Sequence, residues 1–332
     1  MTTAASASTT SAAPTAGHRV EVSGLTKVFG RVKAVNELSF TVEPGTVTGF
    51  LGPNGAGKTT TLRCLLGLIS PSDGTATIGG SRYAELAAPT HTVGAMLEAS
   101  SFHPRRTGRD HLRVYCRAAG IAHSRADEVL ELVGLAAAAG RKAGQYSLGM
   151  RQRLGLAAAL LGDPPVLILD EPANGLDPEG IAWMRQLLRQ LAEQGRTVLV
   201  SSHLLREMQQ IADDVVIINR GRLVKQGQLA ELAREHRHAV RVSSPEAERL
   251  ANALDAHAAV ERLDGERLRV TGVDTATVGH LAFTNGVELH ELTAEASDLE
   301  QIFFTLTENE AGDTGTGTGD AEPAPSQAGG QP

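Results

Sequence analysis

The feature that most constrains this chain is a glycine-rich stretch between an apolar strand and an apolar helix, "FLGPNGAGKTTTLRCLLGL", at residues 50–68. Within it, Gly52–Thr59 fits the pattern G-x-x-x-x-G-K-[ST], in which backbone N–H groups close around phosphate oxygens. Glycines accept backbone angles that a Cβ would forbid, and the helix that follows carries partial positive charge at its N-terminus. A chance match to four fixed positions is expected in on the order of 1% of chains of this length. The stretch therefore predicts a bound polyphosphate.

Each residue type in this loop has a chemical reason. Lys58 brings a full positive charge to the β- and γ-phosphates, and Thr59 offers a hydroxyl to Mg²⁺. The candidate nucleotide-binding residues are the loop and the first turn of its helix: Gly52, Pro53, Asn54, Gly55, Ala56, Gly57, Lys58, Thr59 and Thr60.

A second candidate group follows the most hydrophobic strand, Val166–Leu169, which ends at Asp170 and Glu171. Parallel α/β sheets carry their ligand chemistry at the carboxyl ends of their strands. Asp170 can hold Mg²⁺, usually through water, and Glu171 can act as a general base or orient the attacking water. His203 follows the next strand, "TVLVSSH", where it can hydrogen-bond a γ-phosphate. The competing interpretations are two solvated acids in a turn and, for His203, a surface or cap residue.

The composition narrows the class of protein. The 332 residues suit one large domain or two smaller ones, and an apolar content of 41% permits a packed core. A net charge of −7 argues against a protein that coats nucleic acid, because phosphate binding needs a basic face. Cys64 and Cys116 fit no zinc or redox spacing and suit a reducing cytosol. No apolar run approaches the roughly 18 residues of a membrane span.

Strands alternate with helices from Arg19 onward, which predicts an α/β fold with a mostly parallel sheet. One predicted helix, 126–133, is preceded by Ser124, and Asp127 three residues later resembles the second half of a capping box. Near His236 the pattern changes to short strands around alanine-rich helices, which predicts a small α+β unit. Both ends are low-complexity segments that cannot bury a core. The expected division is a disordered tail (1–18), a main domain (19–235), a small accessory domain (236–310) and a second disordered tail (311–332).

In this order, the motifs resemble those of the ATP-binding subunits of ABC transporters, over about Val20–Glu235. The resemblance implies a P-loop NTPase fold with a mixed sheet and a helical subdomain, followed by the small α+β unit. It also implies ATP and Mg²⁺ as cofactors, and ATP hydrolysis coupled to transport across a membrane. Residues 52–60 match the Walker A loop, and residues 166–171 match Walker B with the catalytic glutamate. Glu171 and the switch histidine His203 are then the catalytic residues.

Two further matches come with that resemblance. Phe29, in "KVFG", stands where the family keeps an aromatic side chain that stacks on adenine, and a core phenylalanine is the alternative. The segment Asn174–Pro178, "NGLDP", is similar to the D-loop of the family, with Asp177 as its key acid. Phe29 and Asp177 therefore join the expected nucleotide-binding residues.

Two stretches depart from the family pattern. The signature segment (Tyr146–Met150) reads Y-S-L-G-M where the family usually has L-S-G-G-Q. Ser147 and Gly149 are kept and can offer a hydroxyl and N–H groups to a γ-phosphate, whereas Leu148 adds bulk where the backbone should approach phosphate. At the Q-loop, Glu98 replaces a glutamine; its carboxylate can still meet Mg²⁺, and a plain surface acid is the alternative. The expected metal ligands are Thr59, Glu98 and Asp170.

These departures, together with "EPANGLDPEG", look like the drug, bacteriocin and lantibiotic exporters in which the membrane part is a separate protein. The resemblance implies export powered through a separate transmembrane permease and a second ABC ATPase subunit, most simply a homodimer. It also implies a cytoplasmic position on the inner face of the cell membrane, held there by the permease. A nucleic-acid partner is not expected. The segment Glu98–Gly108 is the expected contact for a coupling helix of the permease.

Two other functions stay open at this point. One is a soluble ABC ATPase that acts on nucleic acid or ribosomes, although the chain has no second G-x-x-x-x-G-K-[ST], no long heptad pattern and an acidic net charge. The other is a regulatory module that binds nucleotide without hydrolysing it. Glu171 and His203 argue against that module, whereas Leu148 and Glu98 keep it open.

Overall fold

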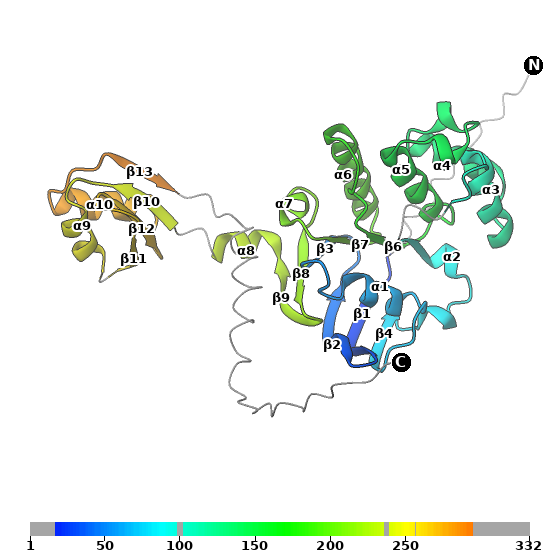
Figure 1. Cartoon of the computed structure of the whole chain (residues 1–332), viewed down its shortest axis with the longest axis horizontal. Helices are drawn as coiled ribbons and strands as arrows, with labels where there is room; N and C mark the ends of the chain where they lie inside the picture. The colour runs from blue at the N-terminus through cyan, green and yellow to red at the C-terminus, as the bar shows by residue number, and fades with distance from the viewer. Residues whose placement is uncertain (1–16, 98–101, 236–238, 256, 295–332) are drawn as a thin grey trace, which may run out of the picture.

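A six-stranded sheet in the order β5-β6-β7-β3-β8-β9 lies at the centre of the main domain (Figure 1). The computed structural model describes residues 17–97, 102–235, 239–255 and 257–294. Strands β5, β6, β7, β3 and β8 run parallel, and β9 is antiparallel to β8, so the expected mixed sheet is confirmed. The strands are β3 (Val47–Leu51), β5 (Val93–Met96), β6 (Val166–Asp170), β7 (Thr197–Ser202), β8 (Asp214–Asn219) and β9 (Arg222–Gln228).

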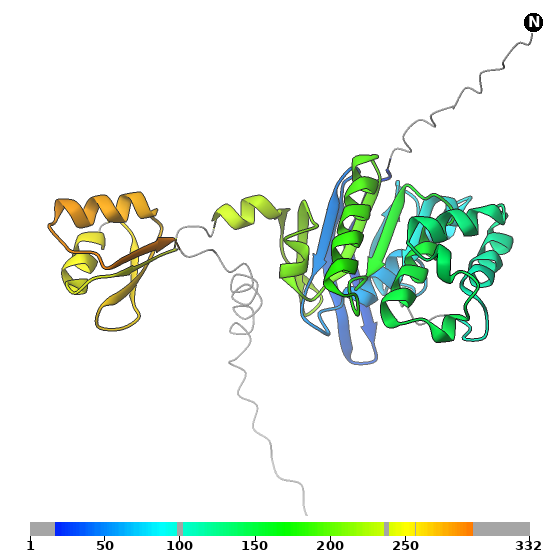
Figure 2. The same ribbon diagram turned by 90° about the horizontal axis from the view of Figure 1, so that it is seen from above.

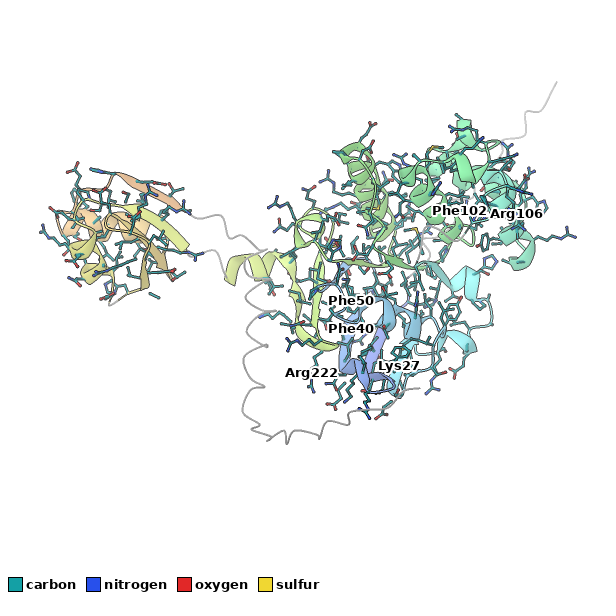
Figure 3. The ribbon with its side chains drawn as sticks, viewed as in Figure 1. Lys27, Phe40, Phe50, Phe102, Arg106 and Arg222 are labelled. Carbon is teal, nitrogen blue, oxygen red and sulfur yellow. The ribbon has the colours of Figure 1, made fainter. Side chains whose placement is uncertain are left out.

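Two layers cover the faces of this sheet. Leu167 packs into the layer of helices α5 and α6, and Ile168 packs into the layer of helix α1, because successive strand residues point to opposite faces. The α1 layer also holds an antiparallel sheet, β2-β1-β4, whose Phe40 stacks on Phe50 of β3 with ring centroids 5.2 Å apart (Figure 3). The bounds are α1 (Lys58–Leu65), α5 (Leu148–Ala159), α6 (Pro178–Glu193), β1 (Val20–Phe29), β2 (Val32–Val42) and β4 (Asp73–Ile78).

The expected helical subdomain is confirmed in helices α3 (Gly108–Ala119), α4 (Ser124–Leu132) and α5. The predicted capping box before α4 is wrong, because Ser124 is the first residue of the helix and His123 is its N-cap, without a side-chain cap hydrogen bond. His123 already has helical backbone angles, and the amide of Ala126 donates to its carbonyl. The chain therefore enters this helix one residue too early for the Ser124 hydroxyl to act as a cap.

Short helical segments connect these layers. They are η1 (Tyr83–Glu85), α2 (Pro89–Thr92), η2 (Ala136–Ala138), η3 (Ala143–Gln145), α7 (Leu205–Met208) and α8 (Leu229–Glu235). At the N-terminal side, Gly17 donates to the carbonyl of Gly195, and the His18 carbonyl accepts from the Thr197 hydroxyl, so residues 17 and 18 are attached to the main domain. Within the described ranges, no helix has both the length and the apolar character that a membrane span requires.

The C-terminal unit is α+β, as expected, and has its own hydrophobic core. Its elements follow the β-α-β-β-α-β order of the ferredoxin-like motif, and its sheet has the order β11-β12-β10-β13 with antiparallel neighbours. Helices α9 and α10 pack on one face of that sheet (Figure 2). The bounds are β10 (Ala239–Ser243), α9 (Ala247–Leu254), β11 (Ala259–Arg262), β12 (Arg267–Thr271), α10 (Thr275–Thr284) and β13 (Glu291–Ala294).

Candidate active site

The glycine loop joins the end of β3 to the start of α1, as the sequence predicts. Gly52 and Gly57, the two glycines of the motif, lie where a Cβ would collide with backbone carbonyl oxygens. A Cβ on Gly52 would lie 2.6 Å from the carbonyl oxygen of Ile218, and a Cβ on Gly57 would lie 2.5 Å from that of Ala34. Gly57 also has a φ of 104°, in the left-handed region that disfavours other residues. The loop surrounds a cavity of about 250 Å³, whose lining residues are Ala34, Pro53, Asn54, Gly55, Ala56, Gly57, Lys58, Thr59, Thr60 and Glu171.

Lys58 places its ammonium group in this loop cavity. The residue is only 6% exposed, and its Nζ donates to the Gly52 carbonyl at 2.7 Å and to the Pro53 carbonyl at 3.4 Å. Nζ also lies 3.5 Å from Oε1 of Glu171. A buried charge needs such partners, and all three are oxygens with negative or partial negative charge. Phosphate oxygens of a nucleotide offer the same chemistry at the same place.

Asp170 is held through both of its carboxylate oxygens. Thr59 donates its hydroxyl to Oδ2 at 2.7 Å, and Ser201 donates its hydroxyl to Oδ1. The β6–β7 register places Asp170 directly opposite Ser201. Sequence analysis missed Ser201; its signal is a polar residue at the carboxyl end of the neighbouring strand, and finding it requires the strand order.

The Thr59–Asp170 pair fits Mg²⁺. Both candidate ligand atoms, Oγ1 of Thr59 and Oδ2 of Asp170, are oxygens. Mg²⁺ in phosphate sites is held by one or two carboxylates together with substrate phosphates. In the part of the chain that the structure covers, no group of three or more His, Cys, Asp and Glu side chains is placed to hold a metal by itself. Thr59 and Asp170 would therefore supply two oxygen ligands, and nucleotide oxygens and water would complete the coordination of the ion. Glu98, the third expected ligand, lies outside the described residues.

Glu171 and His203 are in contact. Nδ1 of His203 lies 2.9 Å from Oε2 of Glu171, and the amide of Glu171 donates to the Ser201 hydroxyl at 3.0 Å. Glu171 has a φ of 49°, a left-handed conformation that costs a non-glycine residue free energy and is concentrated at functional sites. Its carboxylate thus lies between the Lys58 ammonium and the His203 ring. Neither a solvated acid in a turn nor an isolated surface histidine describes this arrangement.

Phe29 ends strand β1 and is 49% exposed, with Nζ of Lys27 5.0 Å from the centre of its ring. The alternative of a core phenylalanine is therefore wrong. The β1–β2 register pairs Phe29 with Val32, two residues before Ala34, which lines the loop cavity. The ring itself does not line that cavity but stands on the same hairpin, with a face available for stacking.

The signature segment and the D-loop lie at the starts of two helices. Ser147 is the N-cap of α5 and accepts from the amide of Met150 at 3.3 Å. Asp177 is the N-cap of α6 and accepts from the amide of Gly180 at 2.8 Å. Ser147, Gly149 and Asp177 do not line the loop cavity of their own chain, so the structure does not bring these predicted residues to Lys58.

The side chain of Leu148 is directed at the D-loop. A Cβ on Gly175 would lie 2.1 Å from Cδ2 of Leu148, so the leucine occupies the space that a larger residue at 175 would need. Gln152 of the same helix donates to the carbonyl of Asn174 at 2.8 Å. One side of the Leu148 side chain therefore packs against the D-loop of its own chain, which the sequence did not indicate.

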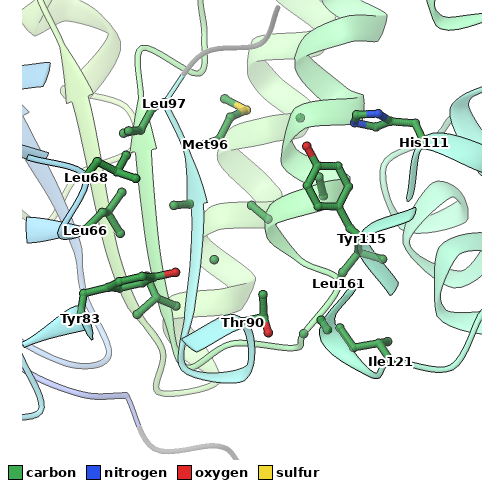
Figure 4. Close-up of a pocket in the computed structure, with 18 of the residues that line it drawn as sticks. Leu66, Leu68, Tyr83, Thr90, Met96, Leu97, His111, Tyr115, Ile121 and Leu161 are labelled. Atoms are coloured by element: carbon green, nitrogen blue, oxygen red, sulfur yellow. The ribbon is translucent and has the colours of Figure 1, made fainter. Parts of the chain in front are cut away.

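A larger cavity, of about 490 Å³, lies between the helical subdomain and the edge strand β5 (Figure 4). We call it the subdomain cavity. Burial lowers the pKa of His111 in its wall, and the nearby Arg106 guanidinium lowers it further. Sequence analysis missed this cavity, because its mostly apolar lining comes from distant segments that include Leu66, Tyr83, Met96, His111, Tyr115 and Leu161.

The chain is similar to known proteins over nearly its whole length. The family model described as ABC transporter matches residues 35–174, and a domain of unknown function, DUF8746, matches residues 238–300. The bacitracin transport ATP-binding protein BcrA of Bacillus licheniformis is 36% identical, covering 86% of this chain and 96% of that protein. The Nod factor export ATP-binding protein I of Burkholderia lata is 35% identical, covering 89% and 98%. A solved ATP-binding subunit of an ABC transporter superposes with a TM-score of 0.59 at 28% identity, covering 65% of this chain and 92% of that one.

Proposed function

Since this chain belongs to the ATP-binding subunits of ABC transporters, which are ATPases, we propose that it powers export through a separate membrane permease. The observation that carries the hydrolysis step of this proposal is the position of the Glu171 carboxylate, between Nζ of Lys58 at 3.5 Å and Nδ1 of His203 at 2.9 Å, and export rests on the relatives named for transport or export. That position suits a residue that meets an attacking water beside a γ-phosphate. It also disfavours a regulatory module without turnover, and relatives named for transport and export weigh against action on nucleic acid.

Nucleotide binding is assigned to the loop cavity and the β1–β2 hairpin. The loop amides and Lys58 bind the phosphates, whose oxygens replace the Gly52 and Pro53 carbonyls at Nζ. Phe29 stacks on the adenine through its exposed ring. Thr59 and Asp170 would hold Mg²⁺, with Glu98 as a further proposed ligand. The ion would neutralise charge that develops on the β- and γ-phosphate oxygens.

Glu171 and His203 act on the water and on the γ-phosphate. The carboxylate of Glu171 accepts a hydrogen bond from the water and orients it, as a general base does. His203 donates Nδ1–H to that carboxylate and so fixes its direction. When the ring is protonated on both nitrogens, Nε2–H is available to a γ-phosphate oxygen.

A second copy of the chain completes each site. Ser147 and Gly149 present a hydroxyl and helix N-terminal amides, but they stand away from the loop cavity of their own chain. In a head-to-tail homodimer they cover the γ-phosphate bound by the partner, with Asp177 beside them. ATP then holds the two copies together and hydrolysis releases them, because ATP favours the closed dimer and ADP does not.

The subdomain cavity is the proposed docking site for a cytoplasmic helix of the permease. It lies between the helical subdomain and strand β5 (Figure 4), so a helix seated there meets both parts of the main domain. Docking holds the chain on the inner face of the membrane. The proposed division is a main domain at 19–235 and an accessory domain at 236–310, each with its own core.

The test is size-exclusion light scattering of Glu171→Gln in Mg-ATP and in ADP. The variant should bind ATP and stop before hydrolysis, so we expect a dimer in ATP and a monomer in ADP. The control is Glu193→Gln, which changes an exposed acid at the C-terminal end of α6 and should retain ATP turnover. A Glu171→Gln protein that hydrolyses ATP as fast as wild type would refute the role of Glu171, and a monomer under both conditions would refute the sandwich of two copies.

A further inference from the structure

Two segments of the helical subdomain run antiparallel and form a surface that we call the basic ribbon, residues 104–108 and 141–145. Thr107 and Lys142 form a β-bridge. The amide of Ala143 donates to the Arg106 carbonyl at 2.8 Å, and the amide of Gly144 donates to the Pro104 carbonyl at 3.0 Å. Backbone pairing therefore fixes the relative position of two stretches that are more than thirty residues apart in the sequence.

The basic ribbon concentrates positive charge on a chain whose net charge is −7. Arg105, Arg106, Arg141 and Lys142 all have exposed side chains. The neighbouring acid Asp110 accepts from the Thr107 hydroxyl at 2.7 Å and so takes part in the cap of α3. A cluster of one sign on an oppositely charged protein attracts a complementary partner and sets its orientation.

The basic ribbon borders the subdomain cavity. Phe102, two residues before the ribbon, lines the cavity, and Figure 3 shows Phe102 and Arg106 on the helical subdomain. The Arg151 guanidinium lies 5.5 Å from the centre of the Phe102 ring and donates to the carbonyl of Gly144 at 3.3 Å. The Arg106 charge reaches His111 in the cavity wall, where it helps to lower the pKa of that imidazole. Phe102 and Arg151 thus join the apolar cavity to the cationic ribbon.

We propose that this surface recognises an acidic amphipathic helix, which places apolar side chains in the subdomain cavity and carboxylates against Arg105, Arg106, Arg141 and Lys142. The inference rests on the proposed function, because the helix belongs to the cytoplasmic side of the permease. It goes beyond that function by specifying the charge of the partner.

The cavity decides among the anionic partners that a basic ribbon can attract. Nucleic acid and the headgroup surface of a bilayer complement the charge, but the surface that each presents is polar and does not match the apolar walls formed by Met96, Leu97 and Phe102. An amphipathic helix satisfies both parts at once, since residues three and four apart share one face and the opposite face carries the charges.

The basic ribbon also leads directly into the signature segment. Tyr146 follows it, donates its hydroxyl to the Ala138 carbonyl at 2.7 Å, and lies so close to Gly108 that a Cβ there would be 2.2 Å from the Tyr146 hydroxyl. Ser147 is the next residue. A helix bound at the basic ribbon therefore contacts the segment that leads directly into Ser147, the N-cap of α5.

The experiment measures binding of a fluorescein-labelled 18-residue helical peptide, with leucine and phenylalanine on one face and glutamate on the other, to the full chain by anisotropy. A matched peptide with glutamine in place of glutamate is the control probe. We expect the acidic peptide to bind at least about tenfold more tightly, with the difference shrinking as salt rises. Equal binding of the two peptides would overturn the proposal.

Two independent variants locate the binding, Arg105→Glu/Arg106→Glu and Arg141→Glu/Lys142→Glu. Each variant should weaken binding of the acidic peptide about tenfold or more. The control Arg249→Glu/Arg262→Glu makes the same charge change at two exposed arginines of the C-terminal unit and should leave that binding unchanged. Unchanged binding in both ribbon variants would overturn the proposal. So would ribbon-dependent binding to phosphatidylglycerol vesicles or to poly(U) without binding of the acidic peptide.

ATP turnover by the wild-type chain, measured on the same preparation, separates this inference from the proposed function. If the chain hydrolyses ATP but binds the two peptides equally, only the recognition of an acidic helix is refuted. If the chain lacks ATP turnover, the proposed ATP-driven function is refuted, whichever peptide binds.

Discussion

Leu148 of the signature segment lies over Gly175 of the D-loop, where a Cβ on the glycine would be 2.1 Å from Cδ2 of the leucine. Leu148 remains 56% exposed, so the contact is formed by one side of its side chain. Gly175 has a φ of 78°, which favours glycine independently of the contact. The bulky residue in one motif and the missing side chain in the other are therefore complementary, and they join the start of α5 to the D-loop.

The complementarity predicts that Gly175→Ala is destabilising and that Leu148→Ala partly restores it. The left-handed conformation alone costs an alanine about 1–2 kcal/mol, and displacement of Leu148 adds to it. In the double variant only the conformational cost remains. Urea unfolding of the two single variants and the double variant gives the coupling free energy, which we expect to be at least about 0.5 kcal/mol. Strictly additive effects would show that Leu148 and Gly175 do not interact.

The contact between His203 and Glu171 predicts a loss in turnover rather than in binding. In His203→Ala the Glu171 carboxylate keeps Lys58 but loses the ring that directs Oε2. We expect kcat to fall about 100-fold, within the range of positioned proton-transfer groups, with nucleotide affinity within about threefold of wild type. Steady-state ATPase and equilibrium titration of a fluorescent ATP analogue measure the two quantities. A drop in affinity equal to the drop in kcat would instead assign His203 to ground-state binding.

Exposure of Phe29 predicts a graded series at that position. Phe29→Ala removes the face on which adenine stacks, and a stacked aromatic pair contributes about 0.5–1.5 kcal/mol beyond area. We therefore expect the dissociation constant for ATP to rise about two- to tenfold, and Phe29→Trp to bind at least as well as wild type. Since the residue is half exposed, the melting temperature should change little. Equal affinities across Ala, Phe and Trp would remove Phe29 from the site.

Local chemistry explains what the sequence could predict. The Gly52–Thr59 loop and the Val166–Glu171 segment are contiguous, and their chemistry depends on residue type and on position at a strand end. Both are visible without knowledge of the tertiary fold, and so is the alternation of strands and helices that predicts a mostly parallel sheet. The same local reading failed at Ser124, because backbone angles at His123, and not the hydroxyl, determine where α4 starts.

Contacts across the fold explain what the sequence could not predict. Ser201 is one serine among many until the β6–β7 register places it opposite Asp170. Leu148 and Gly175 are apart in the chain and meet only when α5 packs beside the D-loop. The subdomain cavity is assembled from segments between Arg63 and Gly162, and of these the sequence singled out only residues 98–108, which include Phe102. Each of these features depends on tertiary packing that periodicity does not specify.

The two hydrogen bonds of Ser201 predict that one substitution there affects both Asp170 and Glu171. Its hydroxyl donates to Asp170 and accepts from the amide of Glu171, so Ser201→Ala leaves a buried carboxylate oxygen and a backbone N–H without this partner. A buried polar group that loses its hydrogen bond costs about 1–3 kcal/mol, which urea unfolding will measure. A less firmly held Asp170 should also raise the Mg²⁺ concentration needed for half-maximal ATPase activity. Ser201→Thr, which keeps the hydroxyl, should recover most of both losses, and a Ser201→Ala protein with wild-type Mg²⁺ dependence would show that Thr59 alone positions Asp170.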